Sequence, residues 1–259
     1  MRNRIIKKLD EISRSEDVQI LYACESGSRA WGFSSRDSDF DVRFIYLRRK
    51  EWYLSIDLDQ KPDVIELPIV GELDINGWDL RKALRLFQKS NPPLLEWLSS
   101  PIVYKEGTSV IKKLKDLIPN SYSPISCMYH YYKMARNNFR EYLKGDLVWL
   151  KKYLYVLRPV LAVLYLEKGL GPVPMEFSML VAKTVKDPAL LKSINHLLTR
   201  KMAGDELDMG HRDPVLSTFL ENQLERMADQ EFDKRIQRCP VEVLNGFFLE
   251  SFNECSDKR

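Results

Sequence analysis

The chain has 259 residues, of which 44% are hydrophobic and 30% are charged, and its formal net charge is +3. This composition is typical of a globular protein with a substantial core, and the length fits one large domain or two of ordinary size. So mild a charge excludes binding through a uniformly polycationic surface.

The first predicted elements are a helix over residues 2–14 and a buried strand over residues 18–24. The strand segment is apolar and is bounded by polar residues. It is followed by Gly27 and Ser28, which begin a turn toward a short helix. Backbone amides and a serine hydroxyl at such a turn are suited to binding a phosphate group. The sequence therefore predicts a phosphate-binding turn after the first strand.

Two aspartates precede or begin the next predicted strand, over residues 41–47. Asp39 and Asp41 are separated by one residue, so in an extended chain their side chains point to the same face. Arg43 shares this parity, whereas the alternate residues are apolar and are expected to pack inward. Carboxylate oxygens are the ligands that Mg²⁺ prefers, and no cluster of histidines and cysteines offers a competing site. The pattern favours a divalent metal on Asp39 and Asp41; an ordinary polar turn with solvated acids is the alternative.

A second helix is predicted over residues 79–90, with Asp79 as its N-cap. Its apolar residues recur at helical spacing and define a buried face. That face consists of Leu80, Ala83, Leu84 and Phe87.

Beyond Pro119 nearly all of the chain is predicted to be helical, with breaks at glycines and prolines. The predicted helices cover residues 125–144, 147–168, 175–184, 187–202, 213–228, 231–236 and 240–254. The second of these contains Pro159, which either kinks one helix or separates two. The stretch around it, residues 154–166, is the most apolar of the chain, but it is too short to cross a bilayer. Since the segment from Met1 to Arg14 is not a signal sequence either, we expect a cytoplasmic protein without a membrane partner.

Residues 129–158 combine positive charge with aromatic side chains. They contain seven lysines and arginines but only two acidic residues. Lys151, Tyr155 and Arg158 share one face of their predicted helix. Cations and aromatic rings together suit the phosphates and bases of a nucleotide or nucleic acid. The alternative is a solvated cationic helix face above an aromatic core.

The phosphate-binding turn and the paired aspartates together resemble a known arrangement. The chain resembles the motif of the DNA polymerase beta superfamily of nucleotidyltransferases in having Gly27-Ser28, ten further residues and then Asp39-Phe40-Asp41. More narrowly, Gly-Ser-Arg-Ala-Trp-Gly (27–32) and Asp-Ser-Asp-Phe-Asp-Val-Arg-Phe-Ile-Tyr (37–46) resemble the RNA repair pathway DNA polymerase beta family. Further resemblances lie in residues 77–84, 91–104 and 151–159.

The resemblance implies a third carboxylate on a neighbouring strand, flanked by hydrophobic residues. Asp74 and Glu66 both fit, and Asp74 is preferred because aspartate is the usual residue in such sites and its segment leads into the helix over residues 79–90. Asp39, Asp41 and Asp74 would then hold two Mg²⁺ (or Mn²⁺) ions, with Asp74 also helping to accept a proton.

The resemblance also implies where a nucleoside triphosphate binds. Gly27 and Ser28 would hold the β- and γ-phosphates, and Arg29 or Arg43 would neutralise phosphate charge unless they form structural salt bridges. A helical domain would close the cleft and supply further cations. The candidates for these are Lys133, Lys151, Lys152 and Arg158.

The sequence therefore predicts an α+β fold, with a polymerase-beta-like nucleotidyltransferase domain over residues 1–118 and an all-helical domain over residues 119–259. The expected activity is the transfer of a nucleoside monophosphate from a triphosphate to a hydroxyl group, on an RNA end, with release of pyrophosphate. Two alternatives stay open: a protein or small-molecule acceptor, and a catalytically silent module that binds nucleotide or RNA.

Overall fold

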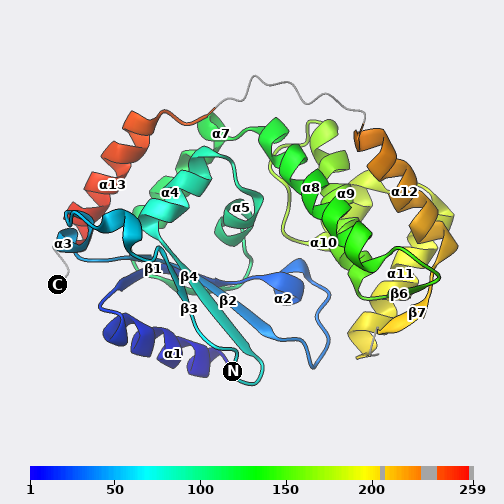
Figure 1. The fold of residues 1–259 in the computed structure, drawn as a ribbon, viewed down its shortest axis with the longest axis horizontal. Helices are drawn as coiled ribbons and strands as arrows, with labels where there is room; N and C mark the ends of the chain where they lie inside the picture. The colour runs from blue at the N-terminus through cyan, green and yellow to red at the C-terminus, as the bar shows by residue number, and fades with distance from the viewer. Residues whose placement is uncertain (205–207, 229–237, 257–259) are drawn as a thin grey trace. The chain divides into compact units, whose positions relative to one another are not determined.

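The computed structural model describes residues 1–204, 208–228 and 238–256, which divide into two compact units (Figure 1). The first unit contains residues 1–30, 39–122 and 238–256; the second contains residues 31–38, 123–204 and 208–228. The division along the chain falls between Tyr122 and Ser123, close to the predicted boundary. Two segments differ from the prediction, because residues 31–38 pack with the second unit and the last helix packs with the first.

The first unit is built on a five-stranded mixed sheet with the strand order β3-β4-β2-β1-β5. The strands are β1 (Gln19–Glu25), β2 (Phe40–Leu47), β3 (Val64–Glu66), β4 (Leu73–Asp79) and β5 (Val103–Glu106). β2 and β4 run parallel, and the other neighbouring pairs are antiparallel. Since parallel strands begin at the same edge of a sheet, the first residues of β2 and β4 lie together.

Helices cover both faces of this sheet. On one face, α1 (Arg2–Ser15) buries Ile5, Leu9 and Ile12 in a cluster with residues of β1, β2 and β4. Apolar residues recurring at spacings of three and four place this face of α1 against the sheet.

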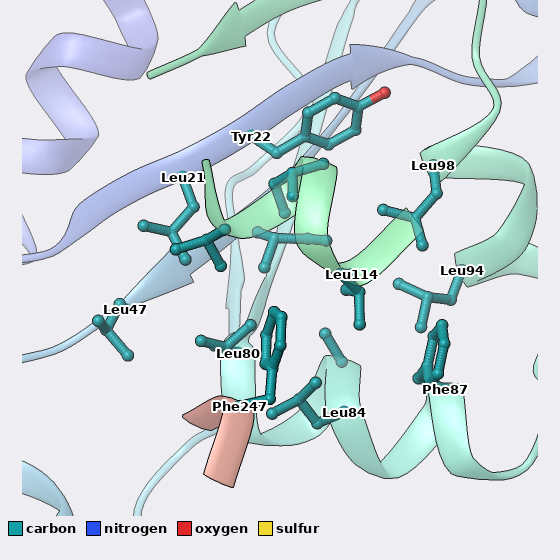
Figure 2. Packing of buried hydrophobic residues seen from close by; sticks show 14 of the residues in the cluster. Leu21, Tyr22, Leu47, Leu80, Leu84, Phe87, Leu94, Leu98, Leu114 and Phe247 are labelled. Atoms are coloured by element: carbon teal, nitrogen blue, oxygen red, sulfur yellow. The ribbon is translucent and has the colours of Figure 1, made fainter. Parts of the chain in front are cut away.

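The opposite face of the sheet carries the larger core. It is covered by α4 (Leu80–Gln88), α5 (Pro92–Leu98), α6 (Val110–Asp116) and α13 (Val241–Ser256). Figure 2 shows Leu21 and Leu47 of the sheet in this core with Leu80 of α4 and Phe247 of α13. α13 belongs to the first unit because Phe247 and Leu244 are buried here.

The start of α4 follows the prediction closely. Asp79 accepts a hydrogen bond from the backbone N–H of Arg81, and the predicted apolar face is the buried one. α5 was not predicted, although Asn91 caps it and Pro92 opens it, which is a recognisable helix-start signal. The remaining short helical segments of this unit are α2 (Gly27–Trp31), whose last residue belongs to the second unit, α3 (Lys50–Tyr53), η1 (Leu58–Gln60) and α7 (Ile118–Ser121).

The second unit is mainly helical, which completes the predicted α+β fold class. Its helices are α8 (Pro124–Tyr142), α9 (Lys152–Glu167), α10 (Phe177–Thr184), α11 (Pro188–Ala203) and α12 (Pro214–Ala228). α9 is buried on nearly all sides, so it forms the centre of this unit. The helix continues through Pro159, which is therefore an interior proline and not a break. No helix in the described parts of the chain has the length and apolar character needed to span a membrane.

One predicted helix start in the second unit is wrong. Residues 147–149 form strand β6 (Leu147–Trp149), which pairs antiparallel with β7 (Met209–His211) instead of opening a helix over 147–168. The partner strand lies about sixty residues away, so no local pattern could reveal the pairing. The predicted helix over residues 231–236 lies outside the described residues.

Candidate active site

Three aspartates lie at the edge of the sheet where β2 and β4 begin. Asp39 directly precedes β2, and Asp41 and Asp74 are the second residues of their strands. Asp41 and Asp74 are register partners on the parallel pair. Glu66, the competing candidate, is exposed on β3 and pairs with Asn76, two residues further along β4. The structure therefore brings Asp74, and not Glu66, beside Asp41.

Arg43 lies between these two carboxylates. Its Nη2 atom donates to Asp74 Oδ2 at 2.7 Å and to Asp41 Oδ1 at 3.2 Å. Its Nη1 atom donates to the backbone oxygens of Asp74 and Val42 at 3.1 Å each. The side chain is only 17% exposed, so the guanidinium is fixed by four hydrogen bonds in a partly buried position.

The geometry at Arg43 tests whether the carboxylates could hold a metal. A single cationic nitrogen already contacts both Asp41 and Asp74, so their oxygens are close enough to share one cation. Carboxylate oxygens without thiolate or imidazole neighbours are the donors that Mg²⁺ and Mn²⁺ accept. In the arrangement seen here, no group of three metal-binding side chains is assembled among the described residues. The donor set therefore fits a divalent ion that would take the place of the guanidinium.

Gly27 lies directly against Asp41. A Cβ atom at Gly27 would be 2.0 Å from Asp41 Oδ2, and the residue has a φ of +59°, which favours glycine. The N–H of Ser26 donates to the backbone oxygen of Asp41 at 2.8 Å, which ties the turn to β2. Ser28 follows at the start of α2 and is buried. The predicted phosphate-binding turn and the predicted metal ligand are thus in direct contact.

Arg29 is fixed to the strand that carries the acids. Its Nε atom donates to the backbone oxygen of Asp39 at 3.0 Å, and its guanidinium lies 3.7 Å from the centre of the Phe40 ring. Arg43 forms the structural salt bridges that the sequence left open as an alternative, whereas these contacts of Arg29 are to a backbone oxygen and an aromatic ring. Together the two residues place two positive charges beside the carboxylates.

Glu25 is a part of this site that the sequence analysis missed. Its side chain is fully buried, and it accepts a hydrogen bond from the backbone N–H of Asp41 at 2.7 Å and one from the Tyr104 hydroxyl. The hydroxyl of Ser100 donates to its backbone oxygen at 2.6 Å. Glu25 therefore joins β1 to β2 and β5 beneath the site. A charged residue ending a buried strand was the available signal, since such a residue needs a partner.

The electrostatics of the site follow from burial. Burial raises the pKa of Asp41; the Arg43 guanidinium opposes this shift, and the charges of Asp74 and Asp39 add to it. Burial likewise raises the pKa of Glu25, against the hydrogen bonds from Tyr104 and from the Asp41 backbone. Crowded carboxylates with raised pKa values are stabilised by added positive charge, as at many functional sites.

The four predicted cations of the helical segment belong to the second unit. Lys133 lies 4.3 Å from the Tyr129 ring and Lys152 lies 4.0 Å from the Tyr142 ring, measured from Nζ to the ring centroid. Both tyrosines are on α8, thirteen residues apart, which corresponds to about 20 Å along a helix. Lys133 and Lys152 therefore do not converge on one point. Lys151 is exposed immediately before α9.

Arg158 differs from the other three cations because it is only 2% exposed. It donates to the backbone oxygens of Met175 and Pro174 at 3.2 and 3.4 Å, and it lies 4.9 Å from the centre of the Trp31 ring. These contacts give Arg158 a structural role inside the second unit. The expectation that it faces a bound triphosphate is not supported by this position.

Comparisons with known proteins show the family of the chain. The sequence pattern of the RNA repair pathway DNA polymerase beta family (RlaP) matches residues 1–250. The chain is 52% identical over 255 residues to the uncharacterized protein YcgL from Bacillus subtilis (strain 168), covering 98% of this chain and 97% of that protein. Among solved structures, it is similar to a nucleotidyltransferase-like protein from Exiguobacterium sibiricum 255-15. That similarity has a TM-score of 0.33 at 13% identity and covers 86% of this chain and 75% of the other. The chain belongs to the RNA repair pathway DNA polymerase beta family.

Proposed function

We propose that the protein is a metal-dependent nucleotidyltransferase that moves a nucleoside monophosphate from a triphosphate to a hydroxyl group of an RNA. The observation that carries this proposal is the contact between Gly27 and Asp41, with Asp74 alongside. This contact puts a turn suited to phosphate next to a carboxylate pair that already shares one cationic group. Family membership supports the same reaction class.

In this proposal, Asp39, Asp41 and Asp74 hold Mg²⁺ or Mn²⁺. When bound, the metal supplies charge neutralisation at the phosphates and lowers the pKa of the acceptor hydroxyl. Gly27 and Ser28 bind the β- and γ-phosphates through backbone amides and the serine hydroxyl. Glu25 fixes the backbone of Asp41, so that the carboxylate stays in register with Asp74.

The reaction itself is a displacement at the α-phosphorus. The acceptor oxygen forms a bond to this phosphorus, the bond between the α-phosphorus and the bridging oxygen breaks, and pyrophosphate leaves. The proton of the acceptor hydroxyl passes to Asp74 or to water. Arg43 is displaced from the carboxylate pair and is then available to neutralise the phosphates. No covalent enzyme intermediate is needed.

Two observations favour RNA over a protein or small-molecule acceptor. The name of the family to which the chain belongs refers to an RNA repair pathway. In the second unit, Tyr129, Trp149 and Tyr155 are exposed among cations, as suits stacking against bases. Lys133, Lys151 and Lys152 are retained as candidate phosphate contacts, and Arg158 is not.

The proposal is tested by incubating the protein with each α-labelled triphosphate, Mg²⁺ or Mn²⁺ and a pool of small RNAs. We expect label on RNA with the wild type and none with the Asp39→Asn/Asp41→Asn double variant. Label on protein or on a small molecule would contradict the RNA acceptor. Failure to bind any triphosphate in the presence of metal would contradict the enzymatic function as a whole.

A further inference from the structure

A basic hollow lies on the face of the first unit that α1 covers. Its volume is about 290 Å³, and it lies between α1 and the chain that leads from β3 into β4. We call it the α1 hollow. It is lined by Arg4, Lys7, Lys8 and Glu11 of α1 and by Leu67, Pro68, Val70, Leu73 and Ile75.

The wall formed by α1 is positively charged. Arg4 and Lys7 are exposed, and among the described residues neither forms an ion pair. Lys8 pairs with Glu11 at 3.2 Å, but both side chains are more than 40% exposed, and such a pair is readily exchanged for another partner. The hollow therefore presents a net positive wall to a ligand.

The opposite wall is apolar. Leu67, Pro68 and Val70 come from the turn between β3 and β4, and Val70 is 63% exposed. A concave site with cations on one side and apolar surface on the other matches a single nucleic acid strand, which has phosphates along one edge and bases along the other. A membrane surface fits less well, because it is flat and because the apolar face of α1 is already buried against the sheet.

The floor of the hollow connects it to the carboxylates. Leu73 and Ile75, which line the hollow, flank Asp74 on β4. Successive side chains of a strand point to opposite faces, so Asp74 emerges on the other side of the same strand end. A layer packed against a sheet lies about 10 Å from it. A few nucleotides can span a distance of this size from the hollow, around the strand end, to the carboxylates.

We propose that the α1 hollow holds the phosphate backbone of the acceptor RNA, a few nucleotides from the end that enters the active site. Arg4 and Lys7 bind phosphates, and the apolar wall supports the bases. This inference rests on the proposed function for the identity of the strand, and it adds where the acceptor lies.

The test measures binding of a fluorescein-labelled twelve-nucleotide single-stranded RNA by anisotropy over a range of salt concentrations. The variant Arg4→Gln/Lys7→Gln removes two cations of the hollow. The control Arg14→Gln/Lys112→Gln removes two exposed cations of the same unit that do not line it. We expect the first variant to bind RNA roughly tenfold more weakly, with the slope of log K against log salt reduced by about 1.4, since each phosphate contact on a single strand contributes about 0.7. The control is expected to bind like the wild type.

Further measurements separate this inference from the proposed function. Triphosphate binding, measured by calorimetry, is expected to be the same in both variants, because neither touches the carboxylate edge. Equal RNA affinity in the two variants would overturn the inference, even if the wild type transfers nucleotides to RNA. Loss of RNA binding in the first variant alone would support it, even if no transfer occurs. Absence of RNA binding by the wild type would overturn the inference. It would also be overturned if Arg4→Gln/Lys7→Gln bound RNA like the wild type and bound only phosphatidylserine vesicles more weakly.

Discussion

Replacing Gly27 with alanine tests the contact on which the site depends. The new Cβ would be 2.0 Å from Asp41 Oδ2 and 2.8 Å from Cγ. Since non-bonded heavy atoms rarely approach closer than 3 Å, the carboxylate must retreat by about 1 Å or more. A displacement of about 1 Å at a catalytic group can lower the rate by about 100-fold. We therefore expect transfer to fall by about two orders of magnitude in Gly27→Ala, with weaker Mn²⁺ binding measured by electron paramagnetic resonance.

Gly71→Ala is the matched control for this prediction. Gly71 has a φ of +62°, close to that of Gly27, but a Cβ there meets no heavy atom within 4 Å. In both variants the alanine must adopt a left-handed backbone conformation, which lowers the free energy of unfolding by about 1–2 kcal/mol. Each variant should therefore have a melting temperature a few degrees below that of the wild type. Only Gly27→Ala should impair metal binding. If both variants bind Mn²⁺ like the wild type, the proposed geometry of the turn and Asp41 is refuted.

Three further predictions concern single residues of the first unit. Arg43→Gln should bind Mn²⁺ several-fold more tightly than the wild type without nucleotide, because the competing guanidinium is removed; unchanged or weaker binding would contradict its role as an occupant of the metal position. Burial raises the pKa of Glu25, so the contribution of Glu25 to the free energy of unfolding falls as the pH rises through that raised pKa. Glutamine does not titrate. The melting temperature of Glu25→Gln, relative to that of the wild type, should therefore be higher at neutral pH than at acidic pH. A melting-temperature difference between Glu25→Gln and the wild type that does not change with pH would refute this prediction. Gly77→Ala should destabilise the fold by about 1–3 kcal/mol in chemical denaturation, since its Cβ would be 2.2 Å from the Phe44 ring, and Phe44→Leu should relieve part of the loss in the double variant.

Local patterns in the sequence predicted much of the fold and part of the site. The alternation of Asp39 and Asp41 with apolar residues predicted a strand here, and β2 begins at Phe40, between the two acids. Helical spacing gave the buried face of α4. Asp74 was preferred over Glu66 by resemblance, and its place as the register partner of Asp41 agrees with that preference. These features depend on residues close in sequence or on short motifs.

The features that were missed depend on contacts between distant segments. Glu25 acquires its role through the Asp41 backbone and Tyr104, which belong to two other strands, and strand pairing cannot be deduced from a local sequence pattern. Arg158 was expected to reach a ligand, but the chain folds Trp31 and the carbonyls of residues 174–175 around it. The pairing of β6 with β7 and the packing of α13 on the first unit likewise depend on tertiary structure.

The most direct test of the account is the mass of a defined RNA after incubation with triphosphates and Mg²⁺. The wild type and Glu66→Gln are predicted to add one or more nucleoside monophosphates to the RNA, and Asp74→Asn is predicted to add none. An RNA whose mass is unchanged by the wild type, or transfer lost in Glu66→Gln but retained in Asp74→Asn, would contradict the proposed reaction or the proposed site.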